Sequence, residues 1–259
     1  MRAAPFFKRI LQDPESESEG ETMVQVERRR APRFAIHPDF PVKAVLSVVG
    51  RDDTGAPMSN SRHAWHWKGR LIDISEQGAR MELGPGIRAR TGDTCDLIIS
   101  VGDFELSVPC HISNFREQDG GTVYGLKHDI ADEATWTSYS QLLEVVALGS
   151  ALKLSARLTK PDESGFLVEQ YASDRPARLT VWRFPRDKSV AAFEFLLKDS
   201  LVRVGAGHDP EYLAGTDATA ARPAPMAKAS EIFRLFQWVV PNLARCVPPD
   251  VRLFLQQYA

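Results

Sequence analysis

The sequence predicts an all-β domain, a barrel or a sandwich that ends in a helix, followed by a second domain of α+β class. The first observation is a series of short apolar runs between residues 27 and 128, separated by turns that contain glycine and aspartate. Such spacing indicates antiparallel β-structure. The second is a change over residues 132–148 to apolar residues at three- and four-residue steps, the spacing of a helix. The third is that strand-like runs precede helix-like runs beyond Gly149, the order of an α+β domain.

The composition is that of a globular protein. The 259 residues are 43% hydrophobic and 25% charged, which excludes collagen-like, mucin-like and wholly disordered chains. The length suits one large domain or two small ones. Lysine and arginine total 32 against 34 aspartate and glutamate, a net charge of −2 with the six histidines neutral. Because proteins that bind DNA through their overall charge are basic, we expect no direct DNA binding.

The cysteines and the apolar runs of the sequence indicate in which cellular compartment the protein is found. Cys95, Cys110 and Cys246 are odd in number and form no CxxC pair, which disfavours a disulfide framework and a structural zinc site. No run of about 18 apolar residues offers a transmembrane helix. The apolar patch near the N-terminus contains Lys8 and Arg9, unlike the uncharged centre of a signal peptide. We therefore predict a cytoplasmic protein.

The chain begins with two segments of opposite charge. Residues 1–26 are predicted to form a disordered acidic tail, because five acids between Asp13 and Glu21 occur without aromatic or β-branched residues. Glu27–Arg33 then carries four arginines within six positions. Pro32 biases the residue before it away from the helical conformation, so this basic segment is expected to be extended.

Two domains are expected to follow. The first, residues 27–148, contains six predicted strands and a final helix: 40–49, 65–74, 79–83, 95–101, 104–112 and 123–127, then 132–148. The second, residues 150–259, contains four predicted strands, a polar loop at 214–228 and two helices: 151–158, 165–171, 177–184 and 190–197, then 230–240 and 249–258. Its role is not indicated by any motif.

Two motifs in the first domain carry chemistry. The basic segment contains Arg29-x-x-x-Arg33, with Arg28 directly in front. At the end of a predicted strand, Asp73, Ser75 and Gly78 form the pattern D-x-S-x-x-G. Each pattern alone is weak evidence, because arginine clusters are often only solvated and the second pattern is common. Together, in this order and within one all-β segment, they indicate a binding site.

These residue types suit an anionic ligand that contains guanine. The planar guanidinium of arginine can grip a phosphate, or the O6 and N7 edge of guanine, through two hydrogen bonds. The Asp73 carboxylate can accept from the N1–H and N2–H₂ edge of guanine. The Ser75 hydroxyl can reach a phosphate or a backbone group, and Gly78 permits a positive φ or a close backbone approach. Arg80 is a further candidate anion contact, because it alternates onto the same side as Gly78.

Residues 27–148 resemble a PilZ domain, a family marked by R-x-x-x-R before the first strand and D/N-x-S-x-x-G on a barrel strand. Gly92-Asp93 also resembles a turn of that family, and Tyr124-Gly125-Leu126 resembles its glycine-marked last strand. The resemblance implies a six-stranded antiparallel barrel with a C-terminal helix. It also implies a bacterial protein that binds the second messenger cyclic di-GMP.

By this resemblance, Arg29 and Arg33 would clamp guanine and phosphate groups of the ligand. Asp73, Ser75 and Gly78 would line the barrel face. The doubled Arg28-Arg29 resembles the form of the motif that is associated with two stacked, intercalated ligand molecules. No cofactor other than this ligand is implied.

Two functions remain open at this point. The first is a cyclic di-GMP receptor that relays binding by conformational change to a protein partner of unknown identity. The second is a PilZ-like adaptor or scaffold that acts through protein contacts without the ligand. We do not expect an enzyme, because the sequence contains no G-x-S-x-G, H-E-x-x-H or G-x-x-x-x-G-K-[ST] motif.

Overall fold

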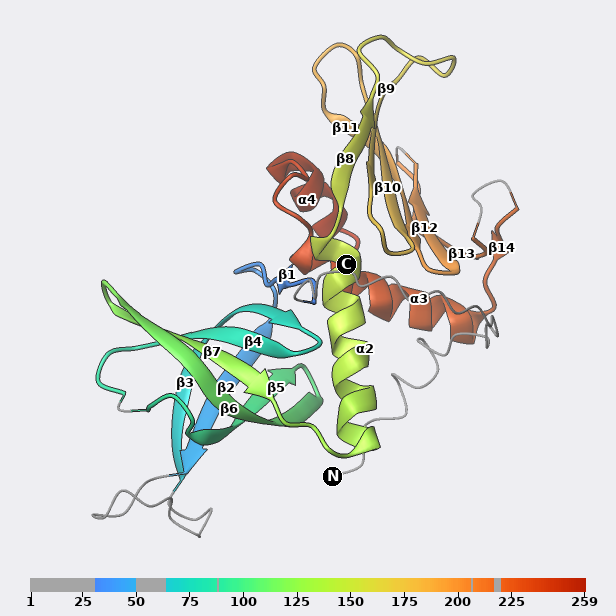
Figure 1. Ribbon diagram of the computed structural model, residues 1–259. Helices are drawn as coiled ribbons and strands as arrows, with labels where there is room; N and C mark the ends of the chain where they lie inside the picture. Colours follow the sequence, from blue (N-terminus) through green and yellow to red (C-terminus); the bar gives the residue numbers. More distant parts are fainter. Residues whose placement is uncertain (1–30, 50–63, 88, 206, 217–219) are drawn as a thin grey trace, which may run out of the picture. The chain divides into compact units, whose positions relative to one another are not determined.

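The computed structural model describes residues 31–49, 64–87, 89–205, 207–216 and 220–259 (Figure 1). The acidic tail expected at residues 1–26 lies outside these ranges. So do Arg28 and Arg29 of the basic segment.

The chain divides into two compact units. The first contains Arg33 and Val42–Leu143, and the second contains Phe34–Pro41 and Glu144–Ala259. The short strand β1 (Phe34–Ala35) therefore lies in a segment that is assigned to the second unit, although it directly follows Arg33.

The first unit is a closed antiparallel barrel. Its strands are β2 (Val42–Val49), β3 (Ala64–Ser75), β4 (Gly78–Leu83), β5 (Thr94–Val101), β6 (Phe104–Gln118) and β7 (Gly121–His128). Within the described part of the chain these six strands pair in the order β3-β2-β5-β6-β7-β4, and β4 pairs back with β3. The prediction of a six-stranded antiparallel barrel is confirmed.

Alternation of buried and exposed side chains accounts for the barrel wall. In β5 the side chains of Cys95, Leu97 and Ile99 point into the core, while Asp96 and its alternates face outward. The two-residue turn Gly102-Asp103 joins β5 to β6, and Gly102 has a φ of +55°, which favours glycine. Beyond Ile112, β6 continues to Gln118 with exposed side chains, so the strand is longer than predicted.

The barrel is followed by α2 (Glu133–Ser150), as predicted. Asp132 caps its first turn by accepting a hydrogen bond from the backbone N–H of Thr135 at 2.8 Å, and this bond lowers the pKa of Asp132. Tyr139 and Leu142 are buried. The helix continues across the boundary between the units, which falls between Leu143 and Glu144.

The second unit contains an antiparallel sheet in which each strand pairs with the next along the chain. Its strands are β8 (Lys153–Arg157), β9 (Leu167–Ala172), β10 (Ala177–Arg183), β11 (Val190–Leu197), β12 (Ser200–Val204), β13 (Glu211–Ala214) and β14 (Arg222–Pro223). They are followed by α3 (Met226–Val239), the 3-10 turn η2 (Val240–Asn242) and α4 (Pro249–Gln256). The predicted α+β class of this part of the chain is confirmed.

An aromatic cluster joins the helices of the second unit to its sheet. Phe193 on β11 stacks against Phe236 of α3 with ring centroids 5.8 Å apart, and it meets Phe254 of α4 edge-on at 6.1 Å. Phe193 and Phe236 are fully buried. The sheet and the helices thus share one core. Aromatic side chains contribute strongly to such a core, because each buries a large apolar surface.

Candidate functional site

The candidate site is centred on the carboxylate of Asp73, near the end of β3. Arg33 donates from Nη1 to Asp73 Oδ1 at 2.9 Å. Arg80, which lies opposite Asp73 on β4, donates from Nε to Asp73 Oδ2 at 2.6 Å, and its Nη2 also contacts that oxygen. The structure therefore brings three of the predicted site residues together, and the two arginines share the carboxylate of Asp73.

The three side chains of this group differ in burial: the carboxylate is buried, and both arginines reach the surface. The Asp73 side chain is 4% exposed, whereas those of Arg33 and Arg80 are 42% and 51% exposed. The bond to Asp73 raises the pKa of Arg80. Two guanidinium groups against one carboxylate leave a local charge of +1 that faces solvent, which is the arrangement of an anion-binding surface.

Within the turn after Asp73, one side chain bonds back to the turn's own backbone. The Ser75 hydroxyl donates to the carbonyl of Gly78 at 3.0 Å, across the two-residue turn between β3 and β4. A Cβ atom on Gly78 would lie 2.0 Å from the carbonyl oxygen of Leu126 on β7. Glycine is required here for close backbone approach, which is one of the two roles predicted for it. Its φ is not positive.

Two buried rings from other elements lie under this turn. The Tyr139 hydroxyl on α2 donates to the Ser75 carbonyl at 2.8 Å. The His128 imidazole meets the Tyr139 ring edge-on, with centroids 4.4 Å apart, and the His128 backbone N–H donates to the Gln77 carbonyl at 3.0 Å. Sequence reasoning did not find Tyr139, because its partner is 64 positions away and no local pattern joins them.

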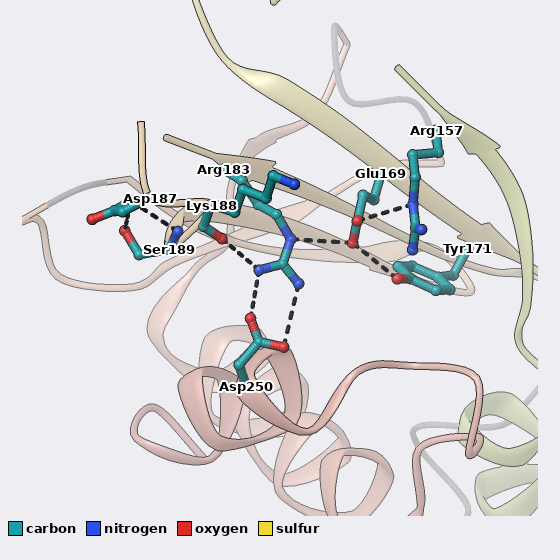
Figure 2. A network of polar contacts seen from close by, with 8 residues as sticks. All are labelled: Arg157, Glu169, Tyr171, Arg183, Asp187, Lys188, Ser189 and Asp250. Carbon is teal, nitrogen blue, oxygen red and sulfur yellow. Dashed lines mark hydrogen bonds and ion pairs between the residues drawn. The ribbon is translucent and has the colours of Figure 1, made fainter. Parts of the chain in front are cut away.

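A second polar cluster lies in the second unit, centred on Arg183 of β10 (Figure 2). Its guanidinium contacts Glu169 Oε2 at 3.2 Å through Nε, and through Nη1 both the Lys188 carbonyl at 2.8 Å and Asp250 Oδ2 at 2.5 Å. Tyr171 donates to the same Glu169 oxygen at 3.0 Å. The two arginines, Arg157 and Arg183, are paired with the two carboxylates of Glu169 and Asp250. We therefore interpret the cluster as a structural network that ties α4 to the sheet.

The requirements of a metal site and of a membrane span can also be compared with the described ranges. Among these residues no group of three or more His, Cys, Asp and Glu side chains could hold a metal ion. Nor does any helix within the described residues have the length and apolarity needed to cross a bilayer.

Comparison with known proteins supports the resemblance of the first unit to a family. The PilZ domain family model matches residues 27–145. A solved structure described as the PilZ domain with c-di-GMP of YcgR from Escherichia coli is 11% identical, covers 45% of this chain and 89% of that chain, and has a TM-score of 0.34. A search of curated proteins returned no match. Residues 27–145, the range that contains the barrel and the start of α2, therefore match the PilZ domain family.

Proposed function

We propose that this protein is a cyclic di-GMP receptor. It binds the dinucleotide at the Arg33–Asp73–Arg80 group of its barrel and relays the binding to a protein partner by conformational change. The observation that carries the proposal is the shared, buried carboxylate of Asp73, which presents two half-exposed guanidinium groups within the range that matches the PilZ family.

The chemistry of this group fits a cyclic dinucleotide. Cyclic di-GMP offers two phosphates and two guanines, and an arginine side chain can bind either through paired hydrogen bonds. Arg33 and Arg80 are held by Asp73 with part of each guanidinium facing solvent. Asp73 has two roles in this proposal. It orients both arginines, and the remaining lone pair of Oδ1 can accept from a guanine N–H.

The stoichiometry depends on the arginines before Arg33. Arg28 and Arg29 lie outside the described residues, and we include them in the proposal as further ligand contacts because of the motif to which they belong. A doubled arginine in this motif fits two intercalated ligand molecules per chain. Calorimetry measures this number directly, and replacing Arg28 by alanine is expected to reduce it from two to one.

The relay is proposed to begin at the peptide bond between Arg33 and Phe34. Arg33 belongs to the first unit, whereas Phe34–Pro41 belongs to the second. There Asn242, which is 1% exposed, accepts from the His37 backbone N–H at 2.7 Å and donates to the Ala35 carbonyl at 3.3 Å. A ligand that fixes Arg33 therefore constrains a segment of the second unit through one covalent bond.

The test is calorimetric titration with cyclic di-GMP of the full chain and of the variants Arg33→Ala and Asp73→Ala. Removal of one charge-assisted contact is expected to weaken binding by roughly 10- to 150-fold, which corresponds to about 1.5–3 kcal/mol. Arg70→Ala is the matched control. It breaks an exposed arginine–carboxylate pair, Arg70 with Glu82, between the same two strands. No binding by the unmodified protein at high ligand concentration would overturn the proposal.

One observation favours the second candidate, a PilZ-like adaptor that acts without the ligand. The carboxylate of Asp73 is already satisfied by Arg33 and Arg80, so these charges have partners within the chain. An adaptor would retain this arrangement for stability. In that case Arg33→Ala lowers the melting temperature, and neither the protein nor the variant binds cyclic di-GMP.

A further inference from the structure

Tyr139 occupies an unusual position between the candidate site and the helix that leaves the barrel. It lies on the part of α2 that belongs to the first unit, and its side chain is fully buried. Its hydroxyl donates to the Ser75 backbone carbonyl at 2.8 Å. Ser75 comes two residues after Asp73 on the same strand, so this bond fixes the backbone next to the charged group.

The turn between Ser75 and Gly78 is held from three sides. Its own Ser75 hydroxyl bonds to Gly78, the His128 backbone of β7 bonds to Gln77, and Tyr139 bonds from α2. Of these three bonds, only the one from Tyr139 comes from outside the barrel strands. It therefore couples a movement of α2 directly to the turn.

The electrostatic surroundings place Tyr139 close to the candidate site. Burial raises the pKa of its phenol, with smaller and opposing effects from the charges of Asp73 and Arg33. The phenol consequently keeps its proton and remains a hydrogen-bond donor at physiological pH. The edge-on His128 ring on one side and the Trp136 ring, 6.4 Å away, leave the Tyr139 ring little freedom to turn.

We propose that Tyr139 is a positioning residue for ligand binding: its hydroxyl sets the Ser75 backbone and, through it, the geometry of Asp73 with Arg33 and Arg80. This inference rests on the proposed function. Because α2 continues beyond Leu143 into the second unit, the same bond links the ligand state of the barrel to that helix. By thermodynamic reciprocity, if the ligand changes the affinity of the protein for a partner that binds α2, that partner changes the affinity for the ligand by the same factor.

The test compares two identical chemical changes at two equally buried tyrosines. Tyr139→Phe keeps the ring and removes the hydroxyl that bonds to Ser75. Tyr171→Phe does the same in the second unit, where the hydroxyl donates to Glu169 at 3.0 Å. Calorimetry gives the dissociation constant of each variant for cyclic di-GMP, and the melting temperature gives its stability.

Tyr139→Phe is expected to weaken binding about tenfold, the effect of one ordinary buried hydrogen bond, while Tyr171→Phe leaves the affinity unchanged. In a double-mutant cycle, Tyr139→Phe is expected to have no further effect on affinity once Asp73 is alanine, because the tyrosine acts through that carboxylate. An unchanged affinity in Tyr139→Phe, or equal losses in both variants, would overturn the inference while the proposed function stands. Absence of binding by the unmodified protein would overturn both.

A measurement on the unmodified chain covers the case in which Tyr139→Phe does not fold. With ¹³C-labelled tyrosine, the ring resonances of Tyr139 are expected to shift when cyclic di-GMP is added, and those of Tyr171 are not. A Tyr139 resonance that is unaffected by saturating ligand overturns the positioning role.

Discussion

At the scale of single residues, the Asp73 carboxylate determines the charge of the candidate site. A buried carboxylate is costly unless it is paired, and here two arginines pair with it. Removing Asp73 therefore frees two guanidinium groups and raises the local charge from +1 to +2. General attraction for anions would increase in Asp73→Ala, whereas the geometry that selects one anion would be lost. The salt dependence of binding separates these two effects, because only the general attraction is strongly screened.

His128 makes the barrel sensitive to acid. Burial lowers its pKa to about 4, which outweighs the opposing effects of the Glu76 backbone and Asp129. Neither ring nitrogen reaches hydrogen-bond geometry with a partner in the described part of the chain. At His128 the unfolded chain takes up a proton below about pH 6.5, whereas the folded chain does so only near pH 4. The contribution of His128 to the free energy of unfolding is therefore constant above about pH 6.5 and falls as the pH drops toward 4.

We predict that His128→Phe removes this part of the acid sensitivity. The loss due to His128 between pH 6.5 and pH 4 is on the order of 2–3 kcal/mol. Phenylalanine keeps an aromatic ring against Tyr139 and cannot be protonated. The measurement is urea unfolding at a series of pH values. Hydrogen exchange of barrel peptides serves as the readout, so that the effect on the first unit alone is measured. Equal pH slopes in the two proteins would contradict the prediction.

At the scale of elements, the sequence predicted those strands whose burial alternates. The six barrel strands and α2 lie near their expected positions because one face of each is buried. The end of β6 was missed because residues 113–118 are exposed on both faces and leave no alternation to read. Two short strands were also missed. β13 ends at the start of the segment 214–228, which was interpreted as a polar loop, and β14 lies within it.

The candidate site was predictable in its residue types and not in its geometry. Arg33, Asp73 and Arg80 were all expected to contact a ligand. Their sharing of one carboxylate depends on the pairing of Asp73 with Arg80, which follows an irregularity in the β3–β4 register between Leu71 and Asp73. A residue pattern along one strand does not contain that register. The same reason hides the Tyr139–Ser75 bond, which depends on how α2 packs against the barrel.

The second unit offers a prediction about its Arg183 network, in which the arginine is 9% exposed. Arg183→Met is expected to destabilise the unit by about 3 kcal/mol or more, because it leaves the buried Glu169 with only the half-exposed Arg157 as a cation. Asp250→Asn is expected to cost less than about 1 kcal/mol, because the Asp250 side chain is 55% exposed and stays hydrated. Urea unfolding of both variants tests the contrast, and equal losses would show that the α4 contact, rather than the buried pair, dominates.

At the scale of the whole molecule, the chain passes from one unit to the other next to the candidate site. The passage at Arg33–Phe34 directly follows a proposed ligand contact, and the passage within α2 follows Tyr139 by four residues. Phe34–Pro41 is anchored in the second unit by several independent contacts. Asn242 bonds to the His37 and Ala35 backbones, Arg252 lies 2.7 Å from the His37 ring, and the Arg175 guanidinium lies 5.5 Å from the Phe34 ring centre.

This arrangement leads to a prediction for hydrogen exchange. Local opening of Phe34–Pro41 needs freedom at the neighbouring Arg33, so a ligand that fixes Arg33 makes this opening less favourable. Saturating cyclic di-GMP is therefore expected to slow exchange at residues 34–41 by about tenfold or more, given a coupling free energy of about 1.4 kcal/mol. The Asp73→Ala variant, treated identically, is expected to show no such change. If protection rises only in the barrel strands, Phe34–Pro41 does not transmit the ligand state, and α2 is left as the connection between the binding site and the second unit.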